Sequence, residues 1–125
     1  MKKNIIASSK FPVAGPYSTA VEAGGMIFIS GQLPINPATG EIVTDIKKAA
    51  RQTLMNIQTI LRETNLDMSH IVKTTIFLKN MADFQVVNEV YAGFFPQEPP
   101  ARSTIAASEL PKGVVLEIEA IAIRK

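Results

Sequence analysis

Arg102, Glu117 and Glu119 are the residues of this sequence whose types and positions best suit anion binding or acid–base chemistry. Arg102 follows Pro99-Pro100-Ala101 and opens a run typical of a strand, so two prolines limit the backbone freedom of the arginine. A planar guanidinium can hold a carboxylate through two parallel hydrogen bonds. Arg102 is therefore a candidate anion-binding residue, and the alternative is a strand-edge arginine that pairs with a neighbouring glutamate.

The two glutamates lie two residues apart on one expected strand, which places their side chains on the same face with roughly 6.5–7 Å between their Cα atoms. Aliphatic residues share that face, so burial and mutual repulsion should raise the pKa of at least one carboxyl group. Such a group can take up or release a proton near neutral pH. The alternative is that one glutamate neutralises Arg102 or a lysine.

Three further residues occupy positions that suit either a site or ordinary structure. Gly31 follows the apolar run Met26–Ser30, where a glycine lets a ligand approach a free backbone amide or simply forms a turn or β-bulge. Asn88 lies beside the apolar stripe of an expected helix, where it satisfies a buried carbonyl or reaches a site. Tyr17 lies on an expected loop, where an aromatic side chain serves as a lid or as a packing contact.

The composition excludes several classes of site. The chain has no cysteine and one histidine, His70, which excludes disulfide scaffolds, thiolate metal sites, cysteine nucleophiles and histidine clusters. The sequence contains no phosphate-binding loop, G-x-S-x-G or H-E-x-x-H motif. We expect no metal site, and we expect His70 to be solvated or hydrogen-bonded to the backbone.

The net charge and the hydropathy of the sequence predict the partners and the cellular location of the protein. Thirteen Lys and Arg residues against eleven Asp and Glu residues give a net charge of +2. The basic residues form no stripe with interleaved aromatics, so no nucleic-acid partner is expected. No run approaches the ~18 apolar residues of a membrane span, and the first residues lack the apolar segment of a signal peptide. We therefore expect a cytoplasmic protein with no membrane partner.

The 125 residues predict a single domain, residues 1–125, with an α+β fold. Apolar residues at three- and four-residue spacing predict a helix over Thr44–Asn65, with Thr44 as its N-cap and Asn65 as a left-handed stop, and a second helix that ends at Pro96. Runs rich in β-branched residues predict strands at Ser18–Ala23, Met26–Ser30, His70–Lys79, Ala101–Ala107 and Val114–Ile123, with a further short strand at Asn4–Ala7. This order predicts two helices packed on one face of a mixed sheet, with the strand order left open.

Along each strand, the residues that point to the uncovered face of that sheet should be polar, but several of them are apolar. Met26, Ile27, Phe28 and Ile29 make both faces of their strand apolar, and the strand face with the two glutamates also carries aliphatic residues. An apolar face with two acids suggests a subunit interface that contains a polar site. The alternative is a larger single-chain core with two solvated glutamates at its margin.

Five short motifs occur in an order that resembles the reactive-intermediate (enamine/imine) deaminase family, the Rid or YjgF group. They are GPYS (Gly15–Ser18), SGQLP (Ser30–Pro34), VNEVY (Val87–Tyr91), PARST (Pro100–Thr104) and LEIEAIA (Leu116–Ala122). The resemblance runs over essentially the whole chain. It implies a chorismate-mutase-like fold, a homotrimer with sites at the subunit interfaces, and no cofactor.

The resemblance also implies a reaction and roles for named residues. The expected reaction is the hydrolysis of 2-enamine/2-imine acids, such as 2-aminoacrylate and 2-iminopropanoate, to 2-oxo acids and ammonia. Arg102 would bind the carboxylate of this small imino acid substrate, and Glu117 would handle the attacking water. The residues that match other substrate-binding positions are Tyr17, Ser30, Gly31, Asn88 and Thr104.

Thr104 stands where many members of the family have a cysteine. Imine hydrolysis needs an activated water and no covalent intermediate, so a threonine that acts through its backbone groups is compatible with activity. Two alternative functions stay open, which are a regulatory protein that binds small carboxylates and an endoribonuclease or translation inhibitor. Binding of RNA would need several lysines and would depend steeply on salt.

Overall fold

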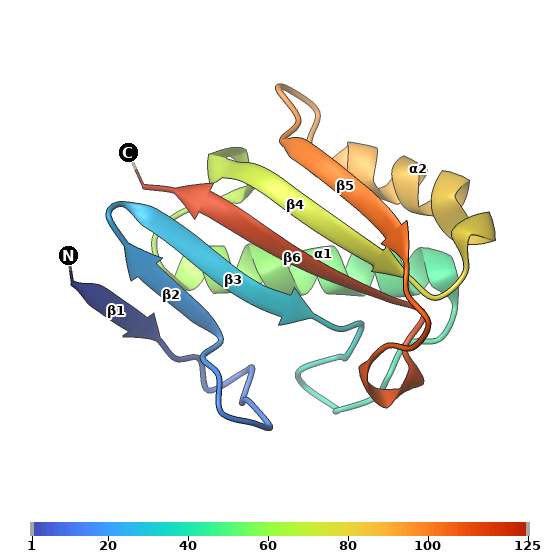
Figure 1. Cartoon of the computed structure of the whole chain (residues 1–125), viewed down its shortest axis with the longest axis horizontal. Helices are drawn as coiled ribbons and strands as arrows, with labels where there is room; N and C mark the ends of the chain where they lie inside the picture. Colours follow the sequence, from blue (N-terminus) through green and yellow to red (C-terminus); the bar gives the residue numbers. More distant parts are fainter. Residues whose placement is uncertain (1, 125) are drawn as a thin grey trace.

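A computed structural model describes residues 2–124, in which six strands and two α-helices follow one another along the chain (Figure 1). The elements are β1 (Lys3–Ile6), β2 (Ala20–Ala23), β3 (Met26–Gln32), α1 (Ile46–Glu63), β4 (Ile71–Leu78), α2 (Phe84–Phe94), β5 (Ala101–Ala106) and β6 (Leu116–Ile123). Short 3-10 turns precede β4, α2 and β6, and they span Met68–His70, Met81–Asp83 and Pro111–Gly113.

All six strands form one mixed sheet in the order β1-β2-β3-β6-β4-β5. The strands β4 and β5, which α2 connects, pair in parallel, whereas the other four neighbouring pairs are antiparallel. The last strand, β6, therefore lies between β3 and β4, and β4 separates it from β5. Figure 1 shows α1 and α2 behind the same face of the sheet. The predicted α+β fold, with both helices on one face of a mixed sheet, is confirmed.

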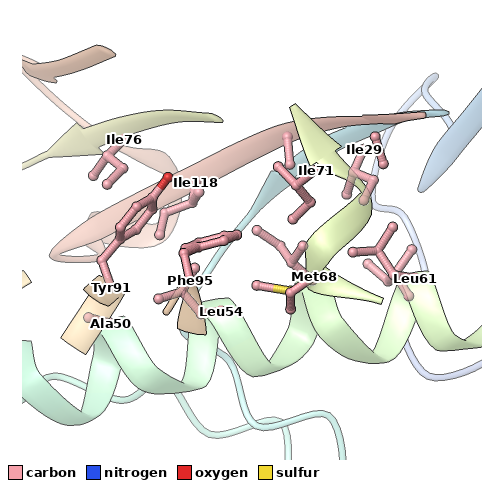
Figure 2. Close-up of a cluster of buried hydrophobic side chains, with 14 of the residues drawn as sticks. Ile29, Ala50, Leu54, Leu61, Met68, Ile71, Ile76, Tyr91, Phe95 and Ile118 are labelled. Atoms are coloured by element: carbon pink, nitrogen blue, oxygen red, sulfur yellow. The ribbon is translucent and has the colours of Figure 1, made fainter. Parts of the chain in front are cut away.

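The core lies between the helices and the covered face of the sheet. From α1, Leu54, Ile57 and Ile60 are fully buried, and they meet Ile76 of β4 and Ile118 of β6. Figure 2 shows these layers in contact, with the Tyr91 hydroxyl directed from α2 toward the sheet. Because side chains alternate along a strand, the core residues fix which face every other residue of β4 and β6 must take.

The N-cap of α1 is Asp45, so the prediction of Thr44 is wrong by one residue. The Asp45 carboxylate accepts a 3.0 Å hydrogen bond from the backbone N–H of Lys48, and its backbone is extended. Thr44 and Asp45 are both good capping residues, and the helix begins at Ile46, so the cap is the residue just before it. The predicted left-handed stop at Asn65 is confirmed by its φ of 65°.

Replacing Asp45 with alanine should lower the free energy of unfolding by about 1 kcal/mol, because the N–H of Lys48 loses its acceptor. The matched control is Thr44→Ala, which removes a neighbouring polar side chain that makes no capping bond and should have a smaller effect. Chemical denaturation of both variants at one fixed protein concentration measures the two changes. A larger loss of stability for Thr44→Ala would show that Thr44, as predicted from the sequence, is the N-cap.

The hairpin between β2 and β3 turns at two glycines, and the short first strand and the start of β4 test further predictions. Gly24 and Gly25 have φ values of 59° and 78°, as a two-residue hairpin turn between β2 and β3 requires. The predicted short strand near the N-terminus is present as β1. His70 ends a 3-10 turn and does not belong to β4, because its ring Nδ1 accepts a hydrogen bond from the backbone N–H of Asp67 in a capping box. The expected hydrogen bond to the backbone is thus confirmed.

The face of the sheet turned away from the helices stays apolar and uncovered in a single chain. Phe28 of β3 is 42% exposed and Ile105 of β5 is 48% exposed, and the half-buried Ile121 and Ile123 of β6 share this face. A monomeric protein rarely leaves such a patch in contact with water. None of the helices formed by residues 2–124 has the length and hydrophobicity to cross a membrane.

Candidate functional site

Arg102 lies on the edge strand β5, and its side chain takes the helix-covered side of the sheet. It pairs with Thr74 of β4, which is buried beneath the helices. The Arg102 guanidinium donates a 2.7 Å hydrogen bond to the side-chain oxygen of Asn88 on α2. The β4-α2-β5 unit thus brings together two of the residues predicted for the site.

Two aromatic rings of α2 flank this guanidinium. The Arg102 Cζ lies 4.9 Å from the ring centroid of Tyr91 and 5.5 Å from that of Phe84, both within the range of cation–π contacts. A 2.6 Å hydrogen bond joins the Tyr91 hydroxyl to Thr74 Oγ1 and fixes the ring. Burial raises the pKa of the Tyr91 phenol, so this hydroxyl stays neutral at physiological pH.

No carboxylate among residues 2–124 forms an ion pair with Arg102, so the expected alternative of a neighbouring glutamate is wrong. One amide oxygen and two neutral rings hold the cation in place. Thr104 pairs with the buried Ile76 and therefore takes the same side of β5 as Arg102. We call Arg102, Asn88 and Thr104 the edge group, and its unneutralised guanidinium is suited to hold an anion.

Glu117 lies on the opposite, uncovered face of the sheet. It pairs with Phe77 of β4, whereas its neighbours Leu116 and Ile118 point into the core. Its carboxyl group lies over the backbone of Gly31, where a Cβ added to the glycine would collide with Oε2 and lie 2.7 Å from Cδ. The register of β3 against β6 shifts here, so the structural alternative for Gly31, a β-bulge, is present. The glycine leaves room for a carboxylate of the same chain.

The environment of Glu117 confirms the expected pKa shift. Burial is the main cause that raises its pKa above 4.5, and repulsion from Glu119 adds to it. No lysine or arginine among residues 2–124 forms an ion pair with either glutamate, so the alternative of a simple neutralising role is wrong. A carboxyl group with a raised pKa exchanges protons more readily near neutral pH than an ordinary glutamate.

Replacing Gly31 with alanine should lower the pKa of Glu117 toward 4.5, because the added methyl group displaces the carboxylate from its half-buried position. The far end of a glutamate side chain can move, so the fold should persist. Carbon-13 NMR of the carboxyl groups during a pH titration measures the shift. Gly93→Ala on α2, where a Cβ meets nothing within 4 Å, is the control. An unchanged pKa in Gly31→Ala would mean that contact with the glycine does not cause the shift.

Ser30 holds the loop that carries Tyr17 against β3. Its hydroxyl donates a 2.6 Å hydrogen bond to the carbonyl of Ser18, and its N–H donates to the carbonyl of Thr19 at 3.0 Å. The Tyr17 ring is 56% exposed, which fits a lid better than a packing contact within one chain. Tyr17 and Gly31 line a common cavity of about 310 Å³. We call Tyr17, Ser30, Gly31 and Glu117 the face group.

The predicted site residues thus form two separate groups within one chain. Arg102 and Glu117 point to opposite faces of the sheet from strands that β4 separates. One copy of the chain therefore cannot present both side chains to the same small molecule. Together the groups would offer an anion anchor and a proton-exchanging carboxyl group. No cluster of three or more histidine, aspartate and glutamate side chains in the described part of the chain could hold a metal ion.

The aromatic walls around Arg102 were not predicted as part of the site. Phe84 and Tyr91 were assigned to the apolar stripe of the second helix, where Tyr91 indeed reaches the core. The signal that could have found them is their spacing, since residues 84, 88 and 91 fall on one face of a helix. A strand that follows this helix in a parallel crossover lies against that face.

Comparison with known sequences gives one consistent family. The model of the family described as Endoribonuclease L-PSP matches residues 7–124. A RutC family protein of Pyrococcus horikoshii is 47% identical, and the 2-iminobutanoate/2-iminopropanoate deaminase of Escherichia coli K12 is 44% identical. Both alignments cover 100% of this chain and 100% of the relative.

Solved structures give the same result for the fold. The YjgF gene product of E. coli matches with a TM-score of 0.92 and 44% identity, over 98% of this chain and 99% of that chain. E. coli TdcF with bound serine matches with a TM-score of 0.92 and 42% identity, over the same shares of the two chains. Because both matches cover 98% of this chain, the similarity in fold includes the strands and helices that carry the edge group and the face group.

Proposed function

Since this chain belongs to the endoribonuclease L-PSP family, which includes the YjgF and Rid proteins, we propose that it hydrolyses 2-enamine/2-imine acids to 2-oxo acids and ammonia. The observation that carries the proposal is the half-buried guanidinium of Arg102, which is fixed by Asn88 and two rings but has no carboxylate partner among residues 2–124. A guanidinium without a carboxylate partner can bind the carboxylate of a small substrate. A relative that is named as an imine deaminase and another with bound serine support this choice of substrate.

The proposed mechanism uses the two groups for different tasks. Arg102 binds the substrate carboxylate and thereby orients the carbon of the C=N bond. Glu117 accepts a proton from a water molecule, whose oxygen adds to that carbon and forms a carbinolamine. The substrate reacts as its protonated imine, so Glu117 next returns the proton to the amino nitrogen of the carbinolamine. The C–N bond then breaks and ammonia leaves, while the hydroxyl group gives its proton to Glu117 and the C=O bond forms. One water is consumed in each turnover, and a raised pKa suits a carboxyl group that must both accept and return a proton.

We place this site between protomers of a homotrimer, with the edge group of one protomer beside the face group of the next. Support comes from the opposite orientations of Arg102 and Glu117 and from the apolar uncovered face that carries Glu117. A second copy can cover this face and bring a free sheet edge toward the carboxylate. Three copies in a ring would then form three equivalent sites.

Replacing Phe28 with aspartate should convert the trimer to monomers, because each interface would bury a charge among aliphatic side chains. Sedimentation velocity of both proteins at the same concentration measures the mass. Met55→Asp is the matched control, since Met55 is also exposed but lies on α1, on the helical side of the molecule. The proposed interface would be abandoned if Phe28→Asp kept the mass of the parent protein, or if the parent protein were already monomeric.

The reaction is tested by generating 2-iminopropanoate from alanine with an amino-acid oxidase, and by trapping the remaining imine with a hydrazine reagent. The protein should shorten the lifetime of the imine while the yields of ammonia and 2-oxo acid stay the same. Equal imine lifetimes with and without protein would rule out the proposed activity. A parallel assay with RNA tests the alternative nuclease function, and cleavage that persists in Arg102→Ala would indicate a contaminating enzyme.

A further inference from the structure

We propose that the 310 Å³ cavity beside Gly31 binds the substrate side chain and selects imino acids that end in a second acidic group. The favoured substrates would be four- and five-carbon imino dicarboxylates. This inference rests on the proposed function, because it assigns the side-chain pocket of the same site. It follows from the position of the cavity, from the two lysines that line it and from the rigidity of its wall.

The cavity lies where three loops meet at one end of the sheet. Its lining comes from the loop before β2, the loop after β3 and the 3-10 turn before β6, which run along the lower edge of Figure 1. Phe11, Leu33 and Ile35 give it apolar walls, and Lys10 and Lys112 contribute cations. This combination of apolar surface with a few charged groups is typical of a small-molecule pocket.

The cavity adjoins the proposed reaction centre through Gly31. This glycine lines the cavity and also lies beneath the Glu117 carboxylate, and Tyr17 of the face group contributes to the wall. Glu117 does not itself line the cavity, so a substrate whose C=N carbon is close to the carboxylate of Glu117 would extend its side chain past Gly31 to reach it. The 2-carboxylate points the other way, toward the Arg102 of the neighbouring protomer.

Neither lysine of the cavity forms an ion pair with a carboxylate of residues 2–124. Lys112 also adopts a left-handed backbone conformation, with a φ of 57°, which is uncommon and unfavourable for a residue with a side chain. A glycine at this position would fit the turn without strain, as Gly113 does beside it with a φ of 68°. Because a lysine occupies a position whose backbone conformation favours glycine, we assign a binding role to its ammonium group.

Another part of the cavity wall, the loop after β3, is held by hydrogen bonds from Asn56 of α1. This residue is 3% exposed, and its side-chain amide donates to the carbonyls of Leu33 at 3.1 Å and Ile35 at 2.9 Å. Its oxygen accepts a 2.8 Å hydrogen bond from Gln52. Because the loop after β3 is fixed before any ligand arrives, the pocket binds its ligand without first having to order the loop.

The test compares two imines that are generated in the same way, 2-iminosuccinate from aspartate and 2-iminopropanoate from alanine. In the parent protein, kcat/KM should be higher for 2-iminosuccinate. Lys112→Gly removes the cation and relieves the backbone strain, so the fold should be at least as stable as before. It should lower kcat/KM for 2-iminosuccinate at least about tenfold and leave that for 2-iminopropanoate unchanged. Lys10→Gln should act in the same direction without changing the turn.

Lys47→Gln on the exposed side of α1 is the control for a simple loss of positive charge, and it should change neither rate. Equal losses for both imines in Lys112→Gly, or no loss for either, would overturn the pocket assignment. A parent protein that prefers 2-iminopropanoate would overturn it as well. Failure to hydrolyse either imine would instead contradict the proposed function, so the two failures are distinguishable.

Discussion

Replacing Arg102 with alanine should lower kcat/KM for 2-iminopropanoate about 10²–10³-fold. The guanidinium is the one group of the edge group that can neutralise the substrate carboxylate, so its loss leaves that anion unpaired in a partly buried site. The fold should survive, because the arginine lies on an edge strand and contributes no part of the apolar core. Steady-state kinetics and the unfolding midpoint, measured on the same preparation, separate the two effects.

Lysine should not rescue this position. The guanidinium of Arg102 lies against the rings of Tyr91 and Phe84 and donates to Asn88, which fixes its plane. An ammonium group keeps the charge but can neither stack in this way nor form two parallel hydrogen bonds with a carboxylate. Arg102→Lys should therefore recover little of the lost rate.

The matched control is Arg62→Ala, which removes an exposed arginine from α1 and should leave kcat/KM unchanged. Near-complete activity in Arg102→Lys would show that charge alone is needed and that the aromatic walls have no positioning role. Full activity in Arg102→Ala would remove the arginine from the mechanism.

The elements of this fold could be predicted because their periodicity is local. The helical stripe of α1 and the β-branched runs of the strands depend on nearest neighbours along the chain. The strand order could not be predicted, because β6 comes last in the sequence but lies between β3 and β4, which are far from it along the chain. Nothing in its own residues encodes which strands it joins.

The division of the site into the edge group and the face group could not be predicted from the sequence either. On β6, buried aliphatic residues alternate with Glu117 and Glu119, so the face of each glutamate could be predicted. On β5, residues of both faces are at least partly exposed because it is an edge strand, so alternation does not assign a face to Arg102. That assignment needs α2, which contacts one side of the strand. The left-handed Lys112 was likewise hidden, since lysine gives no signal for a positive φ.

Replacing Glu117 with glutamine should lower kcat about 10²–10⁴-fold, because the amide cannot accept a proton from water. The substitution keeps the shape of the side chain over Gly31, so the oligomeric state should be the same as that of the parent protein. In the parent protein, kcat should fall as the pH drops through a pKa above 4.5, since burial raises the pKa of this carboxyl group and the base must be ionised. That acidic limb should disappear from the residual activity of Glu117→Gln, and Glu119→Gln should keep it.

Two inactive variants should restore activity to each other when they share a trimer. In a mixed trimer, a site is intact when its edge group comes from a Glu117→Gln chain and its face group comes from an Arg102→Ala chain. A trimer that carries both tags contains both variants, and one of the three sites in its closed ring is then intact. Co-expressed and doubly tagged trimers should therefore recover about a third of the parent kcat. Trimers of a single variant, mixed after purification without exchange, should stay inactive. Mixed trimers with no recovered activity would mean that Arg102 and Glu117 of neighbouring protomers do not meet, and the geometry of one chain already prevents them from meeting within it.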